Sequence, residues 1–112
     1  MIFAFSDDSS LRVLEGIDDV RRVCEGIDVE ENVYHFFDGK GLRLMPKFIK
    51  PNKKWKLFGF VSWIESGVFE LIPSSNFNTP DILRILETTS VLEPNLYFDN
   101  LDEMKVFLEK QL

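Results

Sequence analysis

A turn signal between two strand-like segments constrains the fold of this chain more than any other feature of its sequence. Residues 33–37 and 42–49 are rich in apolar and aromatic side chains, and Asp38-Gly39-Lys40-Gly41 separates them. Asp-Gly in such a setting is a strong short-range signal for a β-hairpin, because both residues tolerate positive φ. We therefore predict an antiparallel strand pair with Gly39 at positive φ. Pro46 lacks a backbone donor, so its strand should lie at a sheet edge or be interrupted there.

Further strands are expected on both sides of this hairpin. Residues 1–5 and 11–14 are short apolar segments of the kind that forms buried strands. Residues 55–64 and 68–72 flank Glu65-Ser66-Gly67, which predicts a second hairpin. Its first strand is apolar on both faces, so we expect a central strand that is covered on both sides or that contacts another chain.

Three segments have apolar residues at the three- and four-residue spacing of an amphipathic helix: residues 18–26, 80–90 and 101–111. The first helix should end at Gly26, since glycine readily adopts the left-handed conformation of a helix C-terminus. Thr79-Pro80 places an N-cap and a helix-initiating proline before the second helix. Asn100 and Glu103 resemble a capping box at the start of the third.

These elements predict an α+β fold: a single mostly antiparallel sheet of four to six strands, with about three helices packed mainly on one face. At 112 residues the chain has the size of one domain, and we expect residues 1–112 to form it. Hydrophobic residues make up 45% of the chain and include eleven phenylalanines, which supplies a dense core.

The compartment follows from cysteine usage and from the lack of a long apolar segment. Cys24 is the one cysteine and cannot form an internal disulfide, which favours the cytoplasm. The first eight residues lack a basic region, so we expect no signal peptide. The longest apolar stretch, residues 57–64, is far shorter than the roughly 20 residues that span a bilayer, so no membrane association is expected.

The residues that most often carry catalysis or bind metals are scarce and isolated. His35 is the one histidine, and no nucleophile or acid stands at a spacing that identifies a partner for it. Cys24 lies on the apolar stripe of a predicted helix, as an inert core thiol would. We therefore predict no catalytic residue, no metal site and no cofactor. A small enzyme that uses His35 with acids assembled by the fold is an alternative.

Charge is strongly segregated along the chain. Seven of the thirteen basic residues lie between Lys40 and Lys56, a stretch without an acid, and removing them from the formal net charge of -6 leaves -13. Six residues of this stretch are candidate binding residues: Lys47, Lys50, Lys53, Lys54, Trp55 and Lys56. A lysine-guarded strand edge, an acidic protein partner, and anion or nucleic-acid binding are the three interpretations. The acidic remainder of the chain disfavours nucleic acid, because it repels a polyanion.

The acidic remainder of the chain predicts attraction to a basic protein, with Asp28, Glu30 and Glu31 as candidate contacts. Residues 24–30, 33–42 and 46–48 resemble segments of small acidic bacterial proteins of immunity-protein type, which neutralise a toxin by binding it. The resemblance implies toxin neutralisation and transfers no functional residue. The sequence thus favours a non-enzymatic protein-binding module, and its apolar strands also suit a homodimer through an exposed sheet face.

Overall fold

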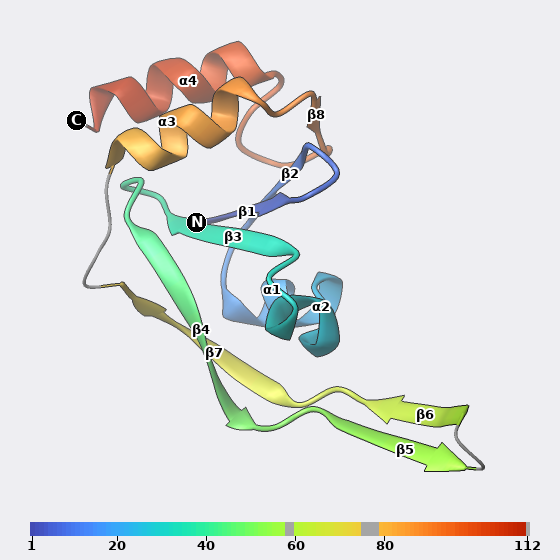
Figure 1. Ribbon diagram of the computed structural model, residues 1–112. Coiled ribbons are helices and arrows are strands. Elements are labelled where there is room, and N and C mark those ends of the chain that lie inside the picture. The colour runs from blue at the N-terminus through green and yellow to red at the C-terminus, as the bar shows by residue number, and fades with distance from the viewer. Residues whose placement is uncertain (58–59, 75–78, 112) are drawn as a thin grey trace.

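The computed structural model describes the backbone of residues 1–57, 60–74 and 79–111, and the side chains there except those of residues 55–57, 60–64 and 79–81. Its main sheet has the strand order β7-β4-β3-β1-β2-β8 (Figure 1). The strands of this sheet are β1 (Ile2–Ser6), β2 (Ser10–Leu14), β3 (Tyr34–Asp38), β4 (Arg43–Lys50), β7 (Val68–Pro73) and β8 (Val91–Leu92). The pairs are antiparallel except for β2 with β8. The predicted α+β class and the mostly antiparallel sheet are confirmed.

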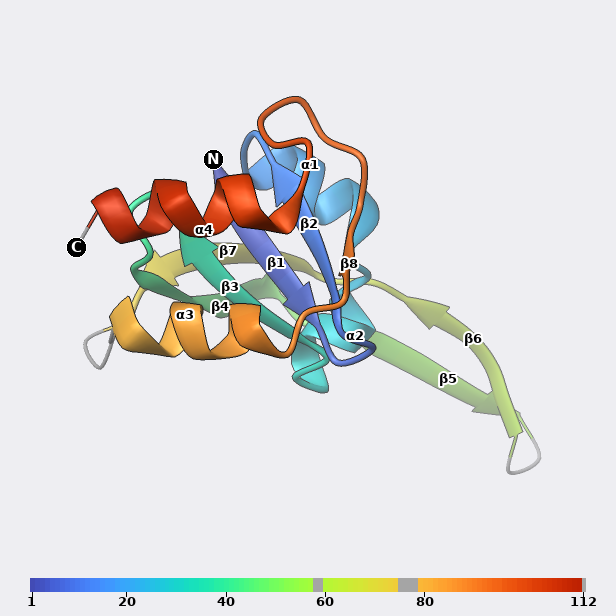
Figure 2. The ribbon, with the colours of Figure 1, turned by 90° about the horizontal axis from the view of Figure 1, so that it is seen from above.

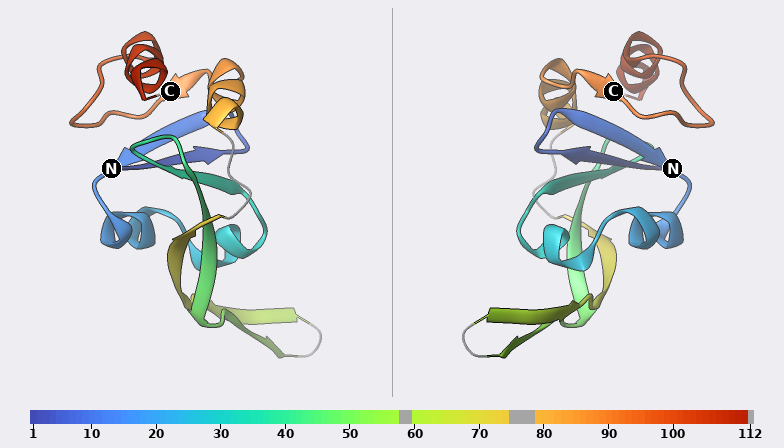
Figure 3. Two further views of the ribbon diagram at one scale, coloured as in Figure 1. Left: turned by 90° about the vertical axis from the view of Figure 1, so that its left-hand side faces the viewer. Right: turned by 90° about the vertical axis from the view of Figure 1, so that its right-hand side faces the viewer.

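Helices cover both faces of this sheet, whereas the sequence predicted cover mainly on one face. The helices of the described residues are α1 (Ile17–Val23), α2 (Gly26–Glu30), α3 (Thr79–Glu87) and α4 (Leu101–Lys110). Figure 3 shows α3 and α4 on one side of the strands and α1 and α2 on the other. Phe37 is buried with Met104 of α4, and its neighbour Phe36 is buried with Val20 of α1. Adjacent residues of a strand point to opposite faces, so two apolar neighbours require two covers.

A long two-stranded arm projects from the body of the molecule. Beyond β4 and β7 the chain forms β5 (Lys53–Leu57) and β6 (Phe60–Glu65), which pair with each other. The predicted single strand over residues 55–64 is therefore wrong, and residues 65–67 connect β6 to β7 rather than forming a hairpin turn. Figure 2 shows β5 and β6 reaching past the other elements, and the molecule measures 53 × 28 × 22 Å. We call β4, β5, β6 and β7 together the arm.

The predicted hairpin between β3 and β4 is confirmed, but Gly41 and not Gly39 has the positive φ, of 83°. The Asp38 carboxylate explains this shape: it accepts hydrogen bonds from the backbone N–H groups of Lys40 and Leu42, at 2.9 and 3.0 Å. The reversal is thereby spread over four residues, and the left-handed conformation falls on Gly41. At Pro46, β4 pairs with β7 within the described residues, while its pairing with β3 stops at Leu44, as expected for an edge position.

Two predicted helix boundaries had different outcomes. Gly26 was expected to end the first helix, but α1 ends at Val23 and Gly26 opens α2 instead. Cys24 and Glu25 are extended and separate the two helices, which lets Val20 and Val29 both reach the core. The cap at Asn100 is confirmed, since its side chain accepts a hydrogen bond from the Glu103 N–H at 2.9 Å. The side chain of Thr79 lies outside the described residues.

Candidate binding surfaces

The basic stretch of the sequence lies along the arm. Residues 43–73 contain six basic and two acidic residues, a formal charge of +4, and the rest of the chain contains seven basic and seventeen acidic residues, a charge of -10. Lys47, Lys50, Lys53 and Lys54 are exposed. Lys50 forms an ion pair with Glu65 of β6, at 3.2 Å. The side chains of Trp55 and Lys56, also candidates, lie outside the described residues.

The candidate acids lie on α2 and beside it, next to the junction of β4 and β5 in the arm. Glu30 and Glu31 are exposed and Asp28 is half-buried. Glu30 accepts a hydrogen bond of 2.8 Å from the side-chain amide of Asn52, which lies between β4 and β5. The fold thus places the acidic candidates beside the basic arm. Their spacing in the sequence did not indicate this proximity.

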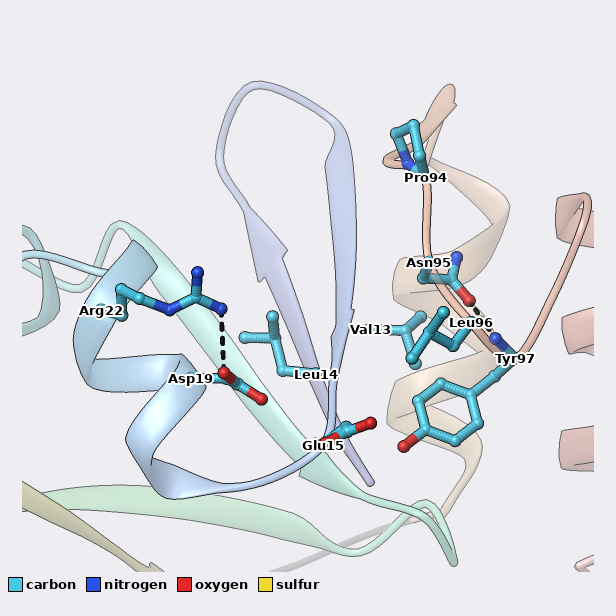
Figure 4. Close-up of a pocket in the computed structure, with 9 residues that line it drawn as sticks. All are labelled: Val13, Leu14, Glu15, Asp19, Arg22, Pro94, Asn95, Leu96 and Tyr97. Atoms are coloured by element: carbon cyan, nitrogen blue, oxygen red, sulfur yellow. Dashed lines mark hydrogen bonds and ion pairs between the residues drawn. The ribbon is translucent and has the colours of Figure 1, made fainter.

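A groove that sequence reasoning missed lies between the end of β2, the start of α1 and the loop that precedes α4 (Figure 4). Its volume is about 330 Å³. Its lining residues come from two distant parts of the chain: Val13, Leu14, Glu15, Asp19, Arg22, Pro94, Asn95, Leu96 and Tyr97. We call it the Leu96 groove. The two segments lie about seventy residues apart in sequence, so no local motif indicates the groove.

Asn95 fixes the loop of the Leu96 groove. Its side-chain oxygen accepts hydrogen bonds from the N–H groups of Tyr97 and Phe98 at 2.9 and 2.8 Å, and its amide donates to the Glu93 carbonyl at 3.0 Å. Phe98 is packed against the core, with its ring centroid 6.3 Å from that of Phe3. The loop is anchored on both sides of Leu96, whose side chain is nevertheless 85% exposed. The ordered loop therefore holds Leu96 in its exposed position.

The opposite wall of the groove is acidic. Glu15, directly after β2, is exposed, and Figure 4 shows its carboxylate on the side of Tyr97 that carries the hydroxyl group. Asp19 of α1 is half-buried and pairs with Arg22 at 2.9 Å. Arg22 neutralises Asp19, so the carboxylate of Glu15 is left to attract a cation. Leu96 and Tyr97 are both exposed on this loop, and tyrosine is among the residues enriched in protein interfaces.

His35 lies on β3 with Arg43 as its hydrogen-bond partner. Its Nδ1 accepts from the Arg43 guanidinium at 2.9 Å, and that guanidinium also lies 5.8 Å from the centroid of the Phe37 ring. His35 is exposed at the surface, but partial burial of its ring and the positive charge of Arg43 lower its pKa below the usual 6.5. A histidine held by a cation lacks the carboxylate that would raise its basicity. This contact gives no support to a general base at His35.

Cys24 is buried, and its burial raises the pKa of the thiol to about 11, so the thiol stays protonated near neutral pH. Among the described residues, no three His, Cys, Asp or Glu side chains gather closely enough to hold a metal ion. No helix in the described part of the chain combines the length and the apolar character needed to cross a membrane. Comparison of the chain with protein-family models, with curated proteins and with solved structures found no match.

Proposed function

We propose that this protein is a non-enzymatic protein-binding module that holds a basic segment of its partner in the Leu96 groove. The proposal rests on the 85% exposure of Leu96, which lies on a loop that Asn95 and Phe98 hold in place. The loop is already ordered before a partner binds, so no further backbone has to be ordered when the partner covers Leu96. This lowers the entropic cost of binding.

The chemistry of the groove selects a lysine or arginine of the partner. The aliphatic part of such a side chain packs on Leu96, and its charge lies between the Tyr97 hydroxyl and the Glu15 carboxylate. The charge of -10 outside the arm steers a basic protein toward the body of the molecule.

Neutralisation of a basic toxin is the form of binding that this charge distribution favours, as the resemblance to immunity proteins implies. Many toxins that act on nucleic acids or membranes are cationic, and an acidic protein that covers the cationic surface blocks their activity. The single cysteine favours the cytoplasm as the compartment in which this binding takes place.

The test compares groove variants with a matched surface control. Partners are captured from a lysate of the source cells on immobilised wild-type protein, identified, purified and then titrated by surface plasmon resonance. Leu96→Ser and Tyr97→Ala should raise the dissociation constant by about tenfold or more, as truncation of interface anchors does. Val106→Ser, at a 52% exposed position of α4, should leave it unchanged. Equal affinity of all three variants would remove the groove as the binding site.

A further inference from the structure

One face of the ribbon formed by β4 and β7 carries exposed apolar side chains in the described part of the chain. Leu44, Phe48, Phe69 and Leu71 turn one side of the β4–β7 ribbon toward the core that α1 and α2 complete. The alternate residues therefore lie on the other side, where β4 and β7 place Met45 opposite Ile72 and Lys47 opposite Glu70. Met45 and Ile72 are each 42% exposed, and Val68 on the same side is 39% exposed. We call this side the arm face.

Arg43 lies on the same side, where β4 begins, and its guanidinium donates to His35 of β3. The other charges of the arm face are balanced. Lys47 and Glu70 are exposed cross-strand neighbours on it, and Lys50 is neutralised by Glu65 at 3.2 Å. The lysines that make the arm basic, such as Lys53 and Lys54, belong to β5 and lie beyond this face. A partner that covers the arm face must therefore match an apolar row with one positive and one negative position, rather than a positive patch.

We propose that a second copy of this chain covers the arm face, in a two-fold dimer whose axis runs along the arm. Such an axis stacks the two ribbons face to face and lays β4 of one copy over β7 of the other. Met45 then meets Ile72 of the second copy, and Lys47 meets Glu70, because each pair stands at one height in the ribbon. Both contacts occur twice, as an isologous interface requires. A two-fold axis across the strands would instead bring Lys47 near Lys47 of the second copy, and the two like charges would repel each other.

The first test measures the oligomeric state of the full chain by sedimentation equilibrium. Wild-type protein should dimerise at concentrations of about 100 μM or below, and Ile72→Asp should raise the dissociation constant by about tenfold or more. Val106→Asp, an equally drastic change on exposed α4, should leave the dimer intact. A wild-type protein that is monomeric throughout this range overturns the proposal, as does an Ile72→Asp dimer as tight as that of the wild type.

The second test uses charge reversal to separate contacts between chains from those within one chain. Lys47→Glu alone places four carboxylates in the dimer interface, and Glu70→Lys alone places four ammonium groups there, so each variant should dissociate. Mixed together, they should form a heterodimer, since the introduced glutamate of one chain then faces the introduced lysine of the other. Native mass spectrometry with one variant ¹⁵N-labelled detects it. Absence of preference for the heterodimer overturns the proposal. The arm face is separate from the Leu96 groove, so this outcome leaves the proposed function unaffected.

Discussion

The side chain of Asn52 accepts a hydrogen bond of 2.7 Å from the backbone N–H of Gly67, and so links the two sides of the arm where the β4–β7 pair ends and the β5–β6 pair begins. Its amide group also donates to the Gly26 carbonyl at 2.9 Å and to Glu30 at 2.8 Å. One side chain thus joins both sides of the arm to α2. Asn52 therefore connects the start of the β5–β6 pair to α2 at the point where the pairing of β4 with β7 has ended.

Replacing Asn52 with Ala should lower the free energy of unfolding by about 1–3 kcal/mol, because the N–H of Gly67 and the carbonyl of Gly26 lose a partly buried partner. Urea unfolding monitored by circular dichroism measures the change. Lys54→Ala, an exposed substitution on the same arm, is the control and should change stability by less than about 0.5 kcal/mol. Equal stability of the two variants would show that Asn52 is dispensable.

The close approach at Gly67 makes a second prediction. A Cβ atom there would lie 2.0 Å from the Lys50 carbonyl oxygen and 2.6 Å from the carbonyl carbon of Pro51, so the backbone must move. Gly67→Ala should therefore cost about 2 kcal/mol or more. Gly16→Ala is the matched control: apart from the adjacent residues, no atom of the described part of the chain lies within 4 Å of its added Cβ, and the effect should stay within about 1 kcal/mol. Thermal unfolding of both variants checks this contrast.

The turn after β3 reverses the roles that the sequence predicted for its two glycines. Gly41 has φ of 83°, whereas an added Cβ at Gly39 would make an ordinary contact of 3.6 Å with the Cβ of Met1. Gly41→Ala should destabilise the protein by about 1–2 kcal/mol, since alanine is strained at positive φ. Gly39→Ala should cost less than about half as much by the same argument. The reverse order in chemical denaturation would contradict the turn geometry.

The features that local chemistry determines could be predicted from the sequence, and those that depend on distant partners could not. The cap of α4 needs Asn100 and Glu103, three residues apart, and it was predicted. The arm was missed because residues 53–57 and 60–65 are both strand-like, and the identity of a strand's partner is not encoded in its own pattern. The adjacent apolar residues Phe36 and Phe37 could have indicated helices on both faces. The Leu96 groove joins distant segments and gave no signal.

The lowered pKa of His35 predicts a pH dependence of stability. Burial and Arg43 disfavour the charged imidazole in the folded protein, so the unfolded chain binds more protons and stability rises with pH. The contribution is complete above the usual pKa of 6.5 and is lost as the pH falls from there through the lower pKa of the folded protein. His35→Gln should flatten this part of the stability profile. Arg43→Gln should raise the pKa of His35, which proton NMR measures directly; an unchanged pKa would exclude the role of Arg43.

The two charged poles of the molecule should act differently on the association with a basic partner. Neutralising the α2 acids with Asp28→Asn, Glu30→Gln and Glu31→Gln should slow association and weaken its salt dependence, because long-range attraction is reduced. Glutamine at position 30 keeps an oxygen that can accept the hydrogen bond from Asn52, so the contact between α2 and the arm is retained.

Reversing Lys53 and Lys54 to Glu is the companion experiment. Both side chains are exposed and belong to the arm rather than to the acidic body, so the affinity for a basic partner should stay within about tenfold of the wild-type value. Surface plasmon resonance measures the association and dissociation rates of both sets of variants, and measurement at two ionic strengths gives the salt dependence of these rates. If the lysine reversal abolishes binding and the acid neutralisation has no effect, the basic arm is the binding site, and an anionic partner replaces the basic one.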